Sequence, residues 1–205
     1  MRFFLKKSPC PICGAKISLF LPTKIGGQYI CDACVGKIDV QEELKHTFTI
    51  PVLKEYMQFY KENQRLKDKF VISQKLDFGC FNAKIIFDFE NHLFCMNKSP
   101  NKTIFEGVEL KSFTIMEDSV LLFEGSKEGL VRYECVIPDR VYAFHLELYL
   151  EHPYWKEINC EIAIPDFSDD DPDADDYLSH DRDYIEWVEQ LARGLMEVAF
   201  PETRE

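Results

Sequence analysis

The chain has 205 residues, of which 46% are hydrophobic, and a formal net charge of −12. This length and apolar content suit one sizeable domain, or a small module beside a medium one. The acidic balance disfavours a role for the whole protein on nucleic acid or on an anionic membrane, because an acidic body repels phosphate.

The charge is unevenly distributed along the chain. Residues 1–65 contain ten lysines and arginines against six acidic residues, a net charge of +4. Because the whole chain carries −12, residues 66–205 carry −16. This asymmetry predicts two modules with different surfaces.

The N-terminal apolar patch at residues 1–7 is too short for the core of a signal peptide, and no apolar run is long enough to span a bilayer. Four of the eight cysteines have metal-like spacing, which indicates a reducing compartment rather than a disulfide framework. We therefore expect a cytoplasmic protein without a membrane partner.

Two Cys-x-x-Cys pairs stand in the predicted first module, residues 1–38. Cys10 and Cys13 form the first pair, and Cys31 and Cys34 form the second. Each spacing aims two sulfurs at one point, and two such pairs complete the tetrahedral shell of a structural zinc site. The alternatives are a redox dithiol or unliganded thiols, but a dithiol enzyme needs only one pair.

A β-hairpin is predicted between the two cysteine pairs. Residues 17–21 form an apolar strand candidate that Pro22 ends, and Gly26 and Gly27 suit a tight turn. The returning strand then leads into the second pair. Such a module has few core residues, so metal binding would supply much of its folding free energy.

Residues 39–68 are predicted to form a helical connector. A short helix covers residues 39–45, and a longer one begins near Pro51, a residue favoured in the first helical turn. An apolar stripe at helical spacing follows, formed by Leu53, Tyr56, Met57 and Tyr60. We expect this stripe to dock on the chain's own sheet rather than on a partner.

Residues 69–205 are predicted to form an antiparallel β domain closed by a C-terminal helix. The strand candidates are 70–72, 84–89, 92–96, 104–106, 113–116, 120–124, 142–150 and 157–164. Alternating apolar and polar residues over 144–150 indicate a half-buried strand. A series of short strands with turn signals between them favours a sandwich or a small barrel. The predicted fold class is therefore α+β.

An acidic segment at 166–183 is predicted to be a solvated loop. Asp171, Asp173 and Asp175 alternate as in a calcium loop. An EF-hand needs glycine at the position that Asp176 occupies and a bidentate glutamate at the position that Arg182 occupies, so an EF-hand is rejected. Weak calcium binding by this loop is the alternative to a solvated loop.

The C-terminal helix is expected to begin near Ser179 or Asp181 and to end before Pro201. Its apolar face contains Tyr184, Val188, Leu191, Leu195 and Val198. A strand series closed by one such helix has the element order of a pleckstrin-homology-like barrel.

The motif Cys10-Pro11-Ile12-Cys13-Gly14, with Tyr29-Ile30-Cys31-Asp32-Ala33-Cys34, resembles a zinc-ribbon-type domain of unknown function. That domain stands at the N-terminus of many short bacterial proteins, often before a pleckstrin-homology-like or uncharacterised domain. Residues 85–94 and 113–118 are similar to segments of those second domains. The resemblance implies the four metal ligands and no catalytic residue.

Three further sets of residues are weaker candidates for sites. His145 and Glu147 share a strand face, and Glu151-His152 follow, but nothing completes a second metal site or an acid/base pair. Ser179-His180-Asp181 are adjacent, whereas a catalytic triad comes from separate elements. The other cysteines are predicted to be buried thiols: Cys80, Cys95, Cys135 and Cys160.

The predicted function is that of a non-enzymatic binding or adaptor protein, with structural zinc and a β domain that binds a protein partner. No small-molecule substrate is indicated, and the turn at 77–82 lacks the basic residues that phosphoinositide binding needs. The first alternative is association with nucleic acid through residues 1–65. The second is a redox sensor, which needs an accessible cysteine with a low pKa.

Overall fold

The computed structural model describes residues 9–17, 23–77, 84–96, 103–117, 119–133, 143–163 and 177–201. The chain divides into two compact units. The first, which we call the cysteine unit, contains residues 1–69 and 99–103. The second, the β unit, contains residues 70–98 and 104–205. The chain therefore returns to the cysteine unit once after leaving it.

A two-stranded hairpin lies between the cysteine pairs of the cysteine unit. Strand β1 (Thr23–Ile25) pairs with β2 (Gln28–Ile30), and Gly26 and Gly27 both have positive φ, which confirms the predicted turn. Ile17, the first residue of the strand predicted at 17–21, lies outside any strand, and residues 18–22 lie outside the described part, so the rest of that strand stays a prediction. Strand β1 begins after Pro22.

Three helices follow the hairpin: α1 (Asp32–Val35), α2 (Glu42–Thr47) and α3 (Ile50–Lys69). The predicted short helix is confirmed, but it begins after residue 41 rather than at residue 39. The predicted long helix has Pro51 in its first turn, where the missing backbone N–H costs no helical hydrogen bond.

The apolar stripe of α3 is buried within the cysteine unit. Leu53 and Tyr56 are almost fully buried. The Tyr56 hydroxyl donates to the Lys37 carbonyl at 2.9 Å and accepts from the Asp39 N–H at 2.8 Å. The expected docking of this stripe on the sheet is therefore wrong, because the segment after α1 and the ring of Phe48, 5.8 Å from that of Tyr56, cover it first.

Asp39 also binds the short segment by which the chain returns to the cysteine unit. One oxygen of its carboxylate, Oδ2, accepts from the Thr103 N–H at 2.8 Å and from the Thr103 hydroxyl at 3.0 Å. Burial raises the pKa of Asp39, while these two hydrogen bonds from Thr103 lower it. Thr103, which is far from Asp39 in the sequence, therefore contributes two hydrogen bonds to the cysteine unit.

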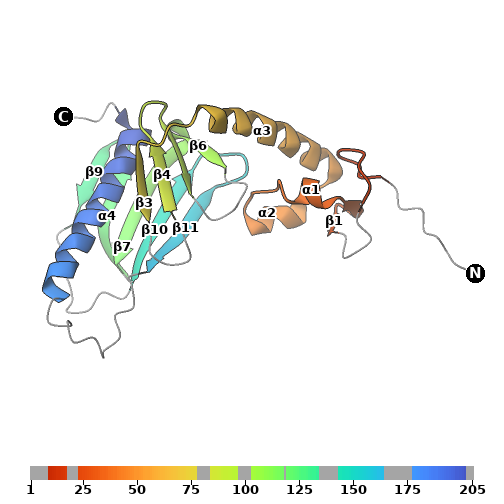
Figure 1. Ribbon diagram of the computed structural model, residues 1–205. Coiled ribbons are helices and arrows are strands. Elements are labelled where there is room, and N and C mark those ends of the chain that lie inside the picture. Colours follow the sequence, from red (N-terminus) through yellow and green to blue (C-terminus); the bar gives the residue numbers. More distant parts are fainter. Residues whose placement is uncertain are drawn as a thin grey trace, which may run out of the picture. The chain divides into compact units, whose positions relative to one another are not determined.

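The described strands of the β unit form two antiparallel sheets (Figure 1). The first has the order β3 (Gln74–Asp77), β4 (Lys84–Asp88), β5 (Leu93–Met96) and β6 (Ile104–Glu106). The second has the order β11 (Glu157–Ala163), β10 (Ala143–Leu150), β7 (Leu110–Glu117), β8 (Val120–Ser126) and β9 (Gly129–Arg132).

Most of the predicted strands are confirmed, including the hairpin of β4 and β5. Residues 70–72 are an exception, since they precede β3 and are not a strand. Strand β9 was not predicted. In the described part of the chain no pairing joins the two sheets, so they do not form the closed barrel that was one alternative. The pleckstrin-homology-like assignment stays a prediction.

Helix α4 (Tyr177–Ala199) packs on the sheets of the β unit. It begins two residues before the predicted start at Ser179, and it ends before Pro201 as predicted. At Gly194, an added Cβ would lie 2.9 Å from the Phe87 ring of β4, so the helix approaches that strand closely. Figure 1 shows α4 running alongside the strands.

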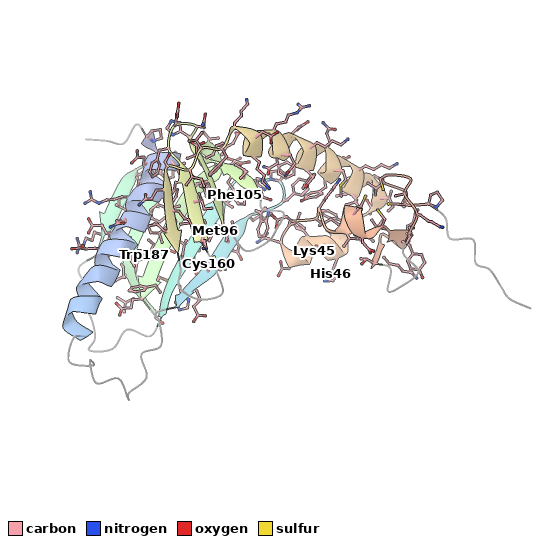
Figure 2. All side chains as sticks on the ribbon, in the orientation of Figure 1. Lys45, His46, Met96, Phe105, Cys160 and Trp187 are labelled. Carbon is pink, nitrogen blue, oxygen red and sulfur yellow. The ribbon has the colours of Figure 1, made fainter. Side chains whose placement is uncertain are left out.

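One continuous core joins both sheets and α4. Phe87 of β4, Phe113 of β7 and Leu191 of α4 all belong to it and are fully buried. Figure 2 labels Met96, Phe105 and Cys160 among the strands and Trp187 on α4. Because interior side chains pack at crystal-like density, a change of volume here is costly.

None of the helices in the described part of the chain has the length and apolar character needed to cross a membrane. The cytoplasmic location stays a prediction.

Replacing Gly107 by alanine should destabilise the β unit. Gly107 lies in the 3₁₀ turn η1 (Gly107–Glu109), and its added Cβ would lie 2.0 Å from the Val198 carbonyl oxygen of α4. Either the turn or the helix end must move, at a cost of roughly 1–3 kcal/mol. Denaturant unfolding of G107A measures this loss. The control V108A removes an adjacent side chain that is 77% exposed and should change stability little.

Candidate metal centre

The first cysteine pair lies on a turn that folds back on itself. The Cys10 N–H donates to the Ala15 carbonyl at 2.9 Å, and the Gly14 N–H donates to the Cys10 carbonyl at 2.8 Å. Gly14 has a φ of 75°, a left-handed conformation that favours glycine. The backbone between the two cysteines is thereby curved, and the turn can present both sulfurs to one point.

The second cysteine pair lies at the start of a helix. Strand β2 leads directly into Cys31, which precedes α1, and the Cys34 and Val35 N–H groups both donate to the Cys31 carbonyl, at 2.9 and 3.0 Å. The Gly26–Gly27 turn packs on the start of α3, since an added Cβ at Gly26 would lie 3.1 Å from the Thr49 Cα. The hairpin therefore connects the second pair to α3.

The four sulfurs of the two pairs converge. The sulfur of Cys10 lies 4.0 Å from that of Cys34, and that of Cys13 lies 3.4 Å from that of Cys31. All four sulfurs lie within 4.8 Å of one another. A tetrahedral zinc ion with Zn–S bonds of about 2.3 Å separates its sulfurs by about 3.8 Å, so the four cysteines fit such an ion.

The four cysteines are free thiols, three of them buried and Cys13 exposed. The 3.4 Å between the sulfurs of Cys13 and Cys31 is far longer than a disulfide bond of about 2.05 Å. The spacing prediction for this cluster agrees with the geometry: the residues that were predicted to share one ion lie together.

Burial, backbone hydrogen bonds and the neighbouring sulfurs shift the pKa values of these thiols in opposite directions. Burial raises the pKa of Cys10, but backbone N–H groups of Cys31, Cys13 and Ile12 outweigh it and lower the pKa to about 6. Burial raises the pKa of Cys34 far above its usual range, and the nearby sulfurs raise it further. Four thiolates so close together repel one another, and a bound cation removes that repulsion.

His145 and Glu147, weighed as part of a second site, are not joined by a third ligand. The Glu147 carboxylate accepts from the Thr114 hydroxyl at 3.2 Å and from the Tyr149 hydroxyl at 2.7 Å. Among the described residues, the cysteine cluster is the single group of three or more His, Cys, Asp or Glu side chains placed to hold a metal ion.

His152 lies beside Glu109, a residue that the sequence analysis missed. The Nε2 atom of His152 is 3.9 Å from a carboxylate oxygen of Glu109, and its Nδ1 accepts from the Tyr154 N–H at 3.1 Å. Nδ1 therefore carries no proton, and the neutral ring holds its proton on Nε2. Glu109 and His152 come together because η1 packs beside the segment that follows β10. The spacing of residues in the sequence does not predict this contact.

Burial decides the protonation of this pair. It lowers the pKa of His152 to about 4. Burial also raises the pKa of Glu109 to about 7, although the Glu106 N–H donates to its carboxylate and lowers it in part. An ion pair would shift both pKa values in the opposite directions, so desolvation outweighs the attraction between these two groups.

The remaining residues that the sequence singled out do not form a site in the described part of the chain. Cys95 and Cys160 are buried, as predicted. Cys80, Cys135, most of the turn at 77–82 and residues 166–176 of the acidic segment lie outside the described residues. Residues 177–183 of that segment belong to α4, so the loop predicted there is wrong. Ser179-His180-Asp181 lie within α4 rather than at its start.

A family model described as a domain of unknown function (DUF4428) matches residues 9–55. The matched span contains all four clustered cysteines, the hairpin, α1, α2 and the start of α3. It agrees with the expected N-terminal cysteine module of unknown function. Comparisons with curated proteins and with solved structures found no match.

Replacing Glu109 by glutamine should change how stability depends on pH. The pKa of Glu109 in the fold is about 7, above its ordinary value of 4.5, so the folded state binds this proton more tightly than the unfolded state. Its contribution is present below about pH 4.5 and is lost as the pH rises through about 7.

Unfolding by urea at about pH 5 and about pH 8 measures this effect. The wild type should lose more stability between the two than E109Q does, and the exposed control E90Q should behave as the wild type. Parallel pH dependences of wild type and E109Q would contradict this account of Glu109.

Proposed function

We propose that the cysteine unit is a structural zinc module in which Cys10, Cys13, Cys31 and Cys34 bind one ion. The observation that carries the proposal is that all four sulfurs lie within 4.8 Å of one another. A closed shell of four protein ligands leaves no position for water or substrate, which distinguishes structural from catalytic zinc. The role of the ion is therefore to stabilise the fold.

The small size of the elements beside the cluster supports a structural role. Strands β1 and β2 have three residues each, and α1 has four. Elements this short are not stable alone, because fixing the first turn or strand pair costs more conformational entropy than its hydrogen bonds return. Zinc binding of the order of 10 kcal/mol offsets that cost.

We further propose that the whole chain is a cytoplasmic, non-enzymatic binding or adaptor protein. In this proposal a zinc-ribbon-type module precedes a pleckstrin-homology-like β unit that binds a protein partner. The closed cysteine shell and the series of antiparallel strands followed by α4 support it. Fold alone does not establish an activity, so the partner must be argued from the surface of the β unit.

Purified full-length protein should contain about one zinc ion per chain. The double variant C31S/C34S should lose the ion, because two ligands of the shell are removed. It should also lose the cooperative unfolding of the cysteine unit while the β unit still melts. Elemental mass spectrometry together with thermal melts checks both outcomes.

The control variant is C160A, which removes a buried cysteine of the β unit core. It should lower the stability of that unit and keep one zinc ion per chain. Freshly reduced wild-type protein without metal, with thiols that react readily, would overturn the zinc module and favour the redox alternative.

A further inference from the structure

The five-stranded sheet has one face in the core and one face toward solvent. On β10, Phe144, Leu146 and Leu148 are buried in the core. The alternate residues Glu147 and Tyr149 lie on the other face, half-buried and exposed respectively. We call this second face the outer face; Figure 1 shows β7, β10 and β11, three of the strands that form it, side by side.

Strand register places two carboxylates in one row across the outer face. Glu147 of β10 is opposite Thr114 of β7, and Thr114 is opposite Glu124 of β8. Because neighbouring strands lie about 4.8 Å apart, the two glutamates are about 10 Å apart. At the β11 side, Glu157 is opposite Tyr149, and Glu161 is opposite His145.

Each carboxylate of the row is held by a tyrosine. The Tyr149 hydroxyl donates to Oε2 of Glu147 at 2.7 Å, and the Tyr133 hydroxyl donates to Oε2 of Glu124 at 2.9 Å. Both tyrosines are about 40% exposed. A carboxylate beside an exposed aromatic ring suits a guanidinium, which pairs with the carboxylate and stacks on the ring.

The described positions of the outer face carry no lysine or arginine, although an opposite charge on a neighbouring strand would stabilise the sheet. The neighbouring cations are used elsewhere. Arg132 lies over the Phe123 ring and pairs with Glu189 of α4, on the core side of the sheet. Lys111 pairs with Glu151.

We propose that the outer face, defined by Glu124, Tyr133, Glu147 and Tyr149, binds an extended arginine- and lysine-rich segment of a partner protein. Charge complementarity selects this occupant, since an acidic face repels nucleic acid and anionic lipid. In an extended polyproline II segment, residues three apart lie on the same side of the chain and about 9 Å apart, which is close to the separation of the two glutamates. The inference rests on the proposed binding role of the β unit and supplies the chemistry of its partner.

The test uses a fluorescent Gly/Ser peptide with two arginines three positions apart, and the full-length, zinc-loaded chain. Fluorescence anisotropy measures binding, and a peptide with citrulline in place of arginine tests the need for charge. The variant E124Q/E147Q should bind the arginine peptide about tenfold more weakly, and added salt should weaken wild-type binding. The citrulline peptide should not bind.

The control variant E55Q/E90Q loses the same formal charge at two exposed positions that are not part of the outer face, one on α3 and one in the turn after β4. It should bind the arginine peptide as the wild type does. An equal loss in both double variants would overturn the proposal, because the attraction would then follow net charge alone. No peptide binding, or self-association that displaces the peptide, would overturn it as well.

Zinc content and thermal melts of the same samples separate this inference from the zinc module. Full zinc loading without peptide binding would overturn the outer-face inference alone. Peptide binding that depends on Glu124 and Glu147 in a chain without zinc would overturn the zinc module alone.

Discussion

Four cysteine sulfurs lie within 4.8 Å of one another, and the organisation of the N-terminal unit depends on how their charge is balanced. Burial and the neighbouring sulfurs raise the pKa of Cys34, so this thiol would give up its proton only to a cation bound among the sulfurs. The cation would hold together a curved turn and a helix start that are joined by a short hairpin. Directly after that helix, the backbone at Lys37 and Asp39 binds the Tyr56 hydroxyl of α3. In the proposed account, the metal centre stabilises the part of the unit that contains β1, β2 and α1, elements of three, three and four residues that are too short to be stable alone.

The β unit depends on a different interaction, the packing of α4 on two sheets. Close approach at Gly107 and Gly194 shows that the helix fits against backbone and aromatic rings with no space for an added methyl group. We therefore propose that the two units fold by different physics, the cysteine unit by metal binding and the β unit by burial of a large apolar core. The apolar core covers one side of the five-stranded sheet, and the other side, the outer face, presents tyrosines and carboxylates to solvent. We propose that the partner protein binds to this outer face.

Sequence reasoning succeeded where the controlling interaction is local. The spacing of Cys10 and Cys13 fixes a turn, and two consecutive glycines fix the hairpin at Gly26 and Gly27. It failed where contacts outside the element decide: periodicity marked the buried face of α3 but did not show that the segment after α1 and Phe48 cover it. The proximity of Glu109 to His152 and the division into two sheets also depend on long-range register, which a single sequence does not encode in any local pattern.

X-ray absorption spectroscopy at the zinc edge of the full-length protein tests the central claim most directly, because it reports the atoms bound to the ion. The account predicts four sulfur ligands at about 2.3 Å and no nitrogen or oxygen ligand. A shell that includes nitrogen or oxygen, or fewer than four sulfurs, would contradict a closed structural centre formed by Cys10, Cys13, Cys31 and Cys34.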